Sequence, residues 1–170
     1  VQNETSTGWN HIYLHSVEKG LVRALTSGEW QVTSVVEATK DKVYYMSTET
    51  SPLRRNLYSI DYKGKKKERL TEKDGTYSIS PSKGMKYYIS NFISASAARE
   101  VELRDGKGKL IRTLVENPEM EERLKTLPKK EFFTFTTERG DKLNAYIIKP
   151  LDFDPQKKYP VLLTQYSGPG

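Results

Sequence analysis

The feature of this 170-residue chain that most constrains its fold is a repeat with a spacing of 43 to 45 residues. The segment HIYLHSVEKGLVRALT (residues 11–26) aligns with NLYSIDYKGKKKERLT (residues 56–71), so that Tyr13 corresponds to Tyr58. A weaker third copy follows as EVELRDGKGKLIRTL, residues 100–114. Repeats of about 40 to 50 residues that consist of short strands are typical of β-propeller blades.

Each copy carries the signals of short antiparallel strands. The segments IYLHSV and LYSIDY alternate and are rich in Tyr, Ile and Val, which favours half-buried strands. Turns with φ > 0 are predicted at three dipeptides: Lys19-Gly20, Lys63-Gly64 and Asp105-Gly106. A second pair of strands in each unit contains a tyrosine pair, Tyr44-Tyr45 or Tyr87-Tyr88. Four short strands per unit indicate a propeller blade, whereas a β-sandwich would not explain the spacing.

The number of repeats bears on the extent of the protein. Fewer than three full units are visible, and propellers usually close with about four to eight blades. The segment GWNHIYL (residues 8–14), close to the start of the sequence, matches the middle of a unit and not its beginning. We therefore expect this chain to be part of a longer protein.

The repeat is lost after Leu114. The segment NPEMEERLKTL (residues 117–127) predicts a helix, because Asn117 can cap it and Pro118 suits its first position. We place a domain boundary near Leu127, so that residues 1–127 hold the propeller blades and this exit helix.

Residues 128–170 have a different character. They predict a hairpin around Arg139-Gly140-Asp141 and then a buried strand within residues 159–165. The run Val161-Leu162-Leu163 is typical of strands covered on both faces, as in α/β sheets. The predicted fold class is therefore mainly β, with the C-terminal blades of a propeller followed by the first strands of an incomplete α/β domain.

Composition limits the chemistry that the chain can support. There are no cysteines, which excludes disulfides, thiolate catalysis and Cys-based zinc sites but does not fix the compartment. The net charge is +6, and much of it lies in the run at residues 63–69. Such a run can indicate nucleic-acid binding, but the flanking acidic residues favour a solvated hairpin tip. No apolar segment has the length of a membrane span, and no signal-peptide pattern is present.

The sequence contains no complete catalytic apparatus. The G-x-S-x-G elbow of serine hydrolases is absent. The two histidines, His11 and His15, lie roughly 13 Å apart on a predicted strand, too far to share a metal. The adjacent Glu121 and Glu122 could anchor a substrate amine, but neighbours on a helix do not face the same way, and the helix dipole explains both. We predict no cofactor and no metal.

A resemblance to a known family adds to these inferences. The order of propeller repeats, short helix, LPKKEFFTF, LDFDPQKKYPVLL and QYSGPG resembles the prolyl oligopeptidase family of serine peptidases, in particular its dipeptidyl peptidases. The resemblance spans essentially the whole chain. It implies that residues 128–170 begin an α/β-hydrolase catalytic domain.

The resemblance also implies a function. It points to an exopeptidase that removes N-terminal dipeptides with Pro or Ala in second place, with no nucleic-acid partner. Tyr166 of QYSGPG matches the family's oxyanion-hole tyrosine, although pattern alone favours a structural tyrosine there. The nucleophile, Asp and His would lie beyond Gly170, so the chain alone would be inactive. Glu121 and Glu122 do not fall at the family's amine-binding position.

Several alternatives remain open at this stage. A relative that releases tripeptides would give the same pattern in this stretch. A non-catalytic propeller that binds protein partners is a different class of function. A homodimer of the full-length protein and a periplasmic or secreted location are implied by the resemblance alone.

Overall fold

The structure is a computed structural model, and it describes residues 2–4 and 8–165. The described part of the chain is mainly β, as the sequence predicts. Its elements follow in this order: β1 (Gln2–Glu4), β2 (His11–Ser16), β3 (Gly20–Ala24), β4 (Val32–Ala38), β5 (Lys42–Ser47), β6 (Asn56–Asp61), β7 (Lys67–Arg69), β8 (Thr76–Pro81), the 3-10 turn η1 (Lys83–Met85), β9 (Tyr87–Ile93), β10 (Glu100–Asp105), β11 (Leu110–Val115), α1 (Pro118–Lys125), β12 (Lys130–Thr136) and β13 (Lys142–Ile148).

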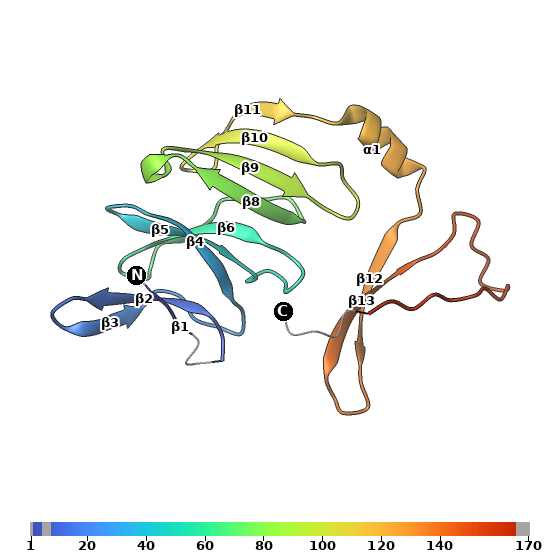
Figure 1. The fold of residues 1–170 in the computed structure, drawn as a ribbon, viewed down its shortest axis with the longest axis horizontal. Coiled ribbons are helices and arrows are strands. Elements are labelled where there is room, and N and C mark those ends of the chain that lie inside the picture. Colours follow the sequence, from blue (N-terminus) through green and yellow to red (C-terminus); the bar gives the residue numbers. More distant parts are fainter. Residues whose placement is uncertain (1, 5–7, 166–170) are drawn as a thin grey trace. The chain divides into compact units, whose positions relative to one another are not determined.

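The chain forms two compact units, residues 1–126 and 127–170. In the first unit, the strands form three antiparallel sheets in the orders β1-β2-β3, β4-β5-β6-β7 and β8-β9-β10-β11 (Figure 1). Within each sheet, neighbours along the chain are neighbours in space, because tight turns join antiparallel strands. The middle and last sheets have the four strands that the repeat predicts.

The repeat extends to individual hydrogen bonds. Leu25 N–H donates to Ile12 O at 2.8 Å, and Leu70 N–H donates to Leu57 O at 2.9 Å, 45 residues further on in each case. A threonine hydroxyl closes the same corner in both copies, as Ile12 N–H donates to Thr26 Oγ1 and Leu57 N–H donates to Thr71 Oγ1. The first and second copies are therefore equivalent in structure as well as in sequence.

Two apolar cores hold the three sheets together. Alternation along β5 sends successive side chains to opposite faces of the middle sheet. Val43 and Tyr45 pack with Ile12 and Leu25 of the first sheet and its exit. Tyr44 and Met46 pack on the other face with four side chains of the last sheet: Tyr77, Met85, Tyr88 and Phe92. The middle sheet is thus covered on both faces.

The predicted hairpin turns are present, with one correction. Gly20 and Gly64 both have φ 71°, as expected. In the third copy the positive φ belongs to Gly108 (89°) and not to Gly106. Gly106 is needed for another reason, because a Cβ there would lie 2.1 Å from the carbonyl oxygen of Met85.

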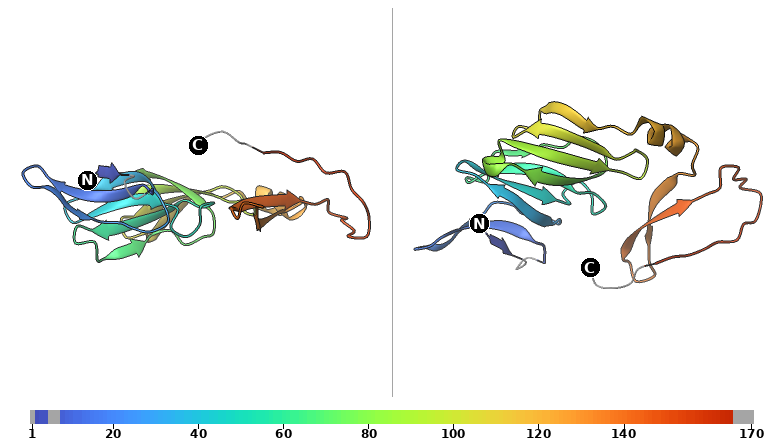
Figure 2. Two further views of the ribbon diagram at one scale, coloured as in Figure 1. Left: turned by 90° about the horizontal axis from the view of Figure 1, so that it is seen from below. Right: turned by 45° about the horizontal axis from the view of Figure 1, so that its top comes forward.

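Strand direction sorts the connections of the first unit into two ends. The turns β2–β3, β4–β5, β6–β7, β8–β9 and β10–β11 lie at one end, which we call the tip end (Figures 1 and 2). The opposite end holds the connections between sheets, the longer loops and α1; we call it the exit end. No helix in the described ranges is long and apolar enough to cross a membrane.

The second unit contains the predicted hairpin. β12 and β13 pair in register from Lys130↔Ile148 to Thr136↔Lys142, with Gly140 at φ 90° in the turn. The prediction of a buried strand within residues 159–165 was wrong for this structure: residues 159–165 form no strand, and Val161 to Leu163 are almost fully exposed. The sheet described in this unit is the two-stranded β12–β13 hairpin, and residues 159–165 pair with neither of its edges.

Candidate functional site

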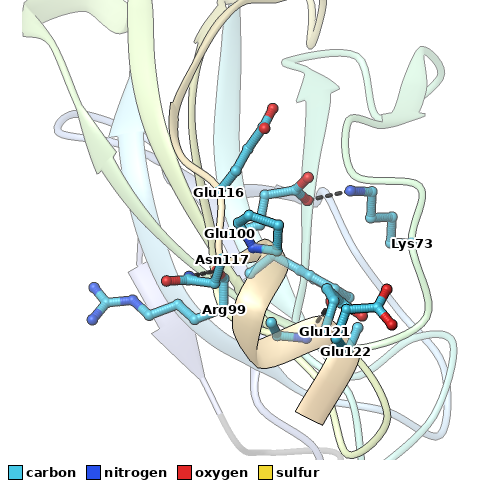
Figure 3. A pocket seen from close by; sticks show the side chains of 11 residues that line it. Lys73, Arg99, Glu100, Glu116, Asn117, Glu121 and Glu122 are labelled. Carbon is cyan, nitrogen blue, oxygen red and sulfur yellow. Dashed lines mark hydrogen bonds and ion pairs between the residues drawn. The ribbon is translucent and has the colours of Figure 1, made fainter. Parts of the chain in front are cut away.

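The first unit has a groove at its exit end. It has a volume of about 550 Å³ and lies between α1, the β9–β10 loop and the connection to β8 (Figure 3). We call it the α1 groove. Its lining residues are Lys73, Phe92, Ala97, Ala98, Arg99, Glu100, Glu116, Asn117, Pro118, Glu121 and Glu122.

Two side chains of the helix region attach α1 to the β9–β10 loop. Glu121 Oε1 accepts the Ala98 N–H at 2.5 Å, and the Asn117 side-chain amide donates to the Arg99 carbonyl oxygen. Asn117 therefore occupies the predicted cap position without capping α1 by its side chain. Pro118 does begin the helix, which ends at Lys125. The segment 117–127 is thus helical as predicted, within two residues at its end.

The floor of the groove is apolar and its rim is charged. Phe92 and Ala98 are buried at its base. Lys73 forms an ion pair with Glu100 across the groove, and Glu122 Oε1 accepts from Lys125 Nζ at 2.5 Å. Lys73 and Glu100 were not predicted, since 27 residues separate them and no local pattern joins them. Nearby, burial raises the pKa of Tyr77, whose hydroxyl accepts the Lys73 N–H.

The groove does not have the composition of a catalytic site. It contains no Ser, Thr, Cys or His that could serve as a nucleophile or base. Glu121 and Glu122 both line it, yet each carboxylate already has a partner within the first unit. No group of three or more His, Cys, Asp or Glu residues with metal-binding geometry occurs in the part of the chain that the structure describes.

Both histidines lie on β2 of the first sheet, and neither is part of the α1 groove. His11 is buried, with Nδ1 3.2 Å from Thr26 Oγ1 and Nε2 2.9 Å from Gly28 O. Its ring also meets Trp30 edge-on, with ring centroids 4.9 Å apart. His15 is exposed, near the end of β2.

The predicted oxyanion residue, Tyr166, lies outside the described residues. Its assignment remains a prediction from the resemblance. The last described residues before it include Tyr159, whose hydroxyl accepts the Asp154 N–H at 3.0 Å and whose ring stacks on Phe153. This hydrogen bond and this ring stacking hold the local loop, and neither involves a catalytic side chain.

The fold defines the class of protein first. Antiparallel sheets of three or four strands, repeated every 43 to 45 residues and packed face to face, are the arrangement found between β-propeller blades. The sequence profile of the family described as "Dipeptidyl peptidase IV (DPP IV) N-terminal region" matches residues 1–98, which is more than half of the chain. The chain belongs to this family.

Individual relatives agree with this membership along almost the whole chain. The "Probable dipeptidyl peptidase 4" of Emericella nidulans is 36% identical over 96% of this chain, and the "Dipeptidyl peptidase 4" of Arthroderma otae is 38% identical over 97%. The crystal structure of Porphyromonas gingivalis dipeptidyl peptidase 4 matches with a TM-score of 0.85 and 38% identity over 93% of this chain. The chain spans only about a fifth of these proteins: 22% of each fungal relative and 23% of the crystallised chain.

Proposed function

We propose that this chain is part of a serine exopeptidase that releases N-terminal dipeptides with Pro or Ala in second position. The observation that supports this most strongly is co-linear similarity to proteins named dipeptidyl peptidase 4 along 96–97% of the chain. The similarity continues beyond the repeat into the second unit. A propeller scaffold without a catalytic domain would not explain this part of the match.

In this proposal the two units have different roles. Residues 1–127 supply blades of a propeller that forms a chamber beside the catalytic domain. Residues 128–170 begin an α/β-hydrolase domain, and Tyr166 donates a hydrogen bond to the oxyanion that develops on the scissile carbonyl. The longer protein would act on peptides in the periplasm or outside the cell, as a monomer or a homodimer.

The first test concerns the chain by itself. Because it contains no G-x-S-x-G elbow, we expect no release of p-nitroaniline from Gly-Pro-p-nitroanilide above the buffer rate. Hydrolysis by the pure 170-residue chain would overturn the assignment of the nucleophile to another segment.

The second test concerns Tyr166 in the longer protein. Replacement Tyr166→Phe removes one oxyanion donor and should lower kcat about 10²–10³-fold with little change in KM. Tyr159→Phe is the matched control, since the hydroxyl of Tyr159 accepts a hydrogen bond from the Asp154 N–H of its own loop. Equal kcat values for the two variants would remove Tyr166 from the mechanism. Mass spectrometry of the products of a longer peptide separates dipeptide from tripeptide release.

A further inference from the structure

The tip end of the first unit carries an unusual density of lysine. Its five turns are residues 17–20, 39–42, 62–66, 82–86 and 105–109, and together we call them the tip surface. They contain ten lysines: Lys19, Lys40, Lys42, Lys63, Lys65, Lys66, Lys83, Lys86, Lys107 and Lys109. The only acidic residues in the same turns are Glu18, Asp41 and Asp105. The surplus of positive charge in these five turns exceeds the net charge of +6 of the whole chain.

Contacts between sheets bring these turns to one surface. Arg23 of β3 donates to the carbonyl oxygen of Lys63, which joins the first sheet to the β6–β7 turn. The Tyr44 hydroxyl donates to Gly106 O at 3.1 Å, and Gly106 N–H donates to Lys86 O at 3.1 Å. The middle and last sheets are therefore joined at the same end, and all five turns lie there in the ribbon views (Figures 1 and 2).

The lysines of this surface are not neutralised within the molecule. Lys42 pairs with Glu68 at 3.4 Å, but the other nine are exposed and form no ion pair with any described residue. Two of the acidic groups at the turns accept hydrogen bonds from the backbone. Asp61 accepts the N–H groups of Lys65 and Lys66, and Asp105 accepts those of Lys107 and Lys109. These two carboxylates thus shape their turns and form no ion pair with the described lysines beside them.

The exit end has the opposite charge balance. Its connections and α1 hold eight acidic residues: Glu29, Glu49, Glu72, Asp74, Glu116, Glu119, Glu121 and Glu122. They hold six basic residues: Arg54, Arg55, Lys73, Arg99, Arg123 and Lys125. A negatively charged surface would therefore attract the tip end and repel the exit end, which orients the unit as it approaches.

We propose that the tip surface binds a lipid bilayer that carries anionic headgroups. The positive charge is spread over the turns of three neighbouring sheets, an arrangement that suits a planar array of charges. Two grooves of the first unit lie at the exit end, and none of their lining residues belongs to the tip surface.

The side-chain types also favour a bilayer over a nucleic acid. All ten basic residues of the tip surface are lysines, which act as point charges and lack the fork with which arginine reads phosphates and bases. Nucleic-acid surfaces interleave basic residues with aromatic side chains that stack on bases. The tyrosine within the tip surface, Tyr62, is half-buried, and its hydroxyl donates to Thr39 O at 2.6 Å. The exposed ring of Tyr87, beside the β8–β9 turn, already has Lys86 Nζ 5.5 Å from its centroid.

The experiment measures binding of the 170-residue chain to vesicles. Vesicles of 30% phosphatidylglycerol and 70% phosphatidylcholine are compared with pure phosphatidylcholine by co-sedimentation in 50 mM NaCl. We expect binding to the anionic vesicles only. Raising NaCl to 0.5 M should abolish it, because the Debye length falls from above about 10 Å to below about 5 Å.

A pair of matched variants tests the location of the binding surface. The triple variant Lys63→Glu, Lys65→Glu, Lys66→Glu reverses three charges on the tip surface. The control Lys129→Glu, Lys142→Glu, Lys158→Glu makes the same change in net charge at exposed positions of the second unit. Each lysine near an anionic membrane strengthens partitioning about five-fold, so the tip variant should lose more than about 100-fold while the control loses far less. Far-UV circular dichroism confirms that both variants fold.

Three outcomes would overturn the proposal. Equal loss of binding in the two triple variants would show that only net charge matters. Absence of binding to anionic vesicles would leave the lysines as a solvated surface. Tighter binding to a 20-base-pair DNA duplex than to anionic vesicles would assign the surface to nucleic acid. None of these assays depends on peptidase activity, so the proposed function is tested independently.

Discussion

The middle and last sheets of the first unit present the same residues to different surroundings. Three positions of the middle sheet and its exit face the last sheet and are buried: Tyr44 (5% exposed), Met46 (6%) and Leu70 (6%). Their counterparts on the last sheet, 43 or 44 residues later, face outward: Tyr87 (41%), Ile89 (40%) and Leu114 (43%). The residues at these positions are of the same type in the two copies, but their burial differs.

The difference shows that burial on a blade face is decided by the neighbouring sheet. An apolar side chain on a strand contributes to stability only where a second layer removes it from water. The outward face of β8–β11 has the same pattern of apolar side chains as the covered face of the middle sheet. This agrees with the propeller that we propose, in which a further blade of the longer protein packs there.

The largest expected effect comes from the three equivalent leucines. Leu25→Ala and Leu70→Ala each empty part of a core between two sheets and should lower the free energy of unfolding by about 2–5 kcal/mol. Leu114→Ala removes the same atoms from the open face and should cost less than about 1 kcal/mol. Urea denaturation of the 170-residue chain measures all three.

The leucine series also has an outcome that would contradict the comparison. If Leu114→Ala costs as much as Leu70→Ala, the outward face is covered in solution and the two sheets do not differ. Gel filtration of the same samples would then show whether a second molecule provides the cover.

A smaller effect is expected at the threonine corners. The Thr71 hydroxyl accepts the Leu57 N–H at 3.1 Å and donates to Asn56 Oδ1 at 3.0 Å, all in a buried corner. Thr71→Val removes the side-chain acceptor of the Leu57 N–H and one of the two donors to Asn56 Oδ1, and it should cost about 1–3 kcal/mol. Asn56 Oδ1 keeps its other donor, Arg69 Nη2 at 3.0 Å. Thr26→Val should behave alike, since Thr26 Oγ1 binds Ile12 N–H in the equivalent place.

The third copy supplies the control for the threonines, because Val115 stands where the first two copies have threonine. Its side chain is exposed, so Val115→Thr should change stability by no more than about 0.5 kcal/mol. Thermal unfolding of the three variants decides the matter. A loss at Val115→Thr as large as that at Thr71→Val would mean that the hydroxyl bonds contribute nothing specific.

The repeat accounts for most of what could be predicted about the fold. In the structure the two members of each tyrosine pair lie on opposite faces of their sheet, as alternation along a strand requires. The positive-φ position of the third turn was misassigned because Asp105-Gly106 resembles a hairpin dipeptide. The spacing of 44 that relates Leu70 to Leu114 also relates Gly64 to Gly108, and Gly108 is the residue that adopts it.

The candidate site was harder to predict, for physical reasons. The α1 groove depends on side-chain to backbone contacts such as Glu121 to Ala98, and a backbone N–H leaves no signature in the sequence. Val161 to Leu163 were predicted to be buried from composition alone, whereas burial also needs a neighbouring strand. The assignment of Tyr166 came from resemblance and stays a prediction.

Tyr88 lies on the covered face of β9, and the pH dependence of the free energy of unfolding reports on its burial. Burial raises the pKa of Tyr88 to about 12, and it also raises the pKa of Tyr77 beside it. An unfolded tyrosine ionises near pH 10, so the folded state holds its proton more tightly. The resulting stability is complete below about pH 10 and is lost as the pH rises toward about 12.

The measurement is the free energy of unfolding at pH 8 and at pH 11.5. We expect the wild-type chain to lose on the order of 1–2 kcal/mol through Tyr88 alone over this interval. Tyr88→Phe should reduce that loss, because it removes the group that titrates. An identical pH dependence in the variant would mean that the buried face of β9 does not exclude water from Tyr88.

The smallest expected effect concerns the connections that lead into the middle and last sheets. Asp74 accepts two hydrogen bonds from Arg54, at 2.7 and 3.2 Å, and this pairing lowers the pKa of its carboxyl. Its equivalent in the previous connection, Glu29, is exposed and forms no ion pair with a described residue.

Because the Asp74 carboxylate is largely exposed, Asp74→Asn should cost less than about 1 kcal/mol and Glu29→Gln still less. With its pKa lowered in the folded state, Asp74 contributes its stability above about pH 4 and loses it as the pH falls further. Thermal unfolding at pH 7 and pH 3 in low salt tests this. If Asp74→Asn destabilises the chain equally at both pH values, the ion pair is not the source of its effect, and the two connections differ only in packing.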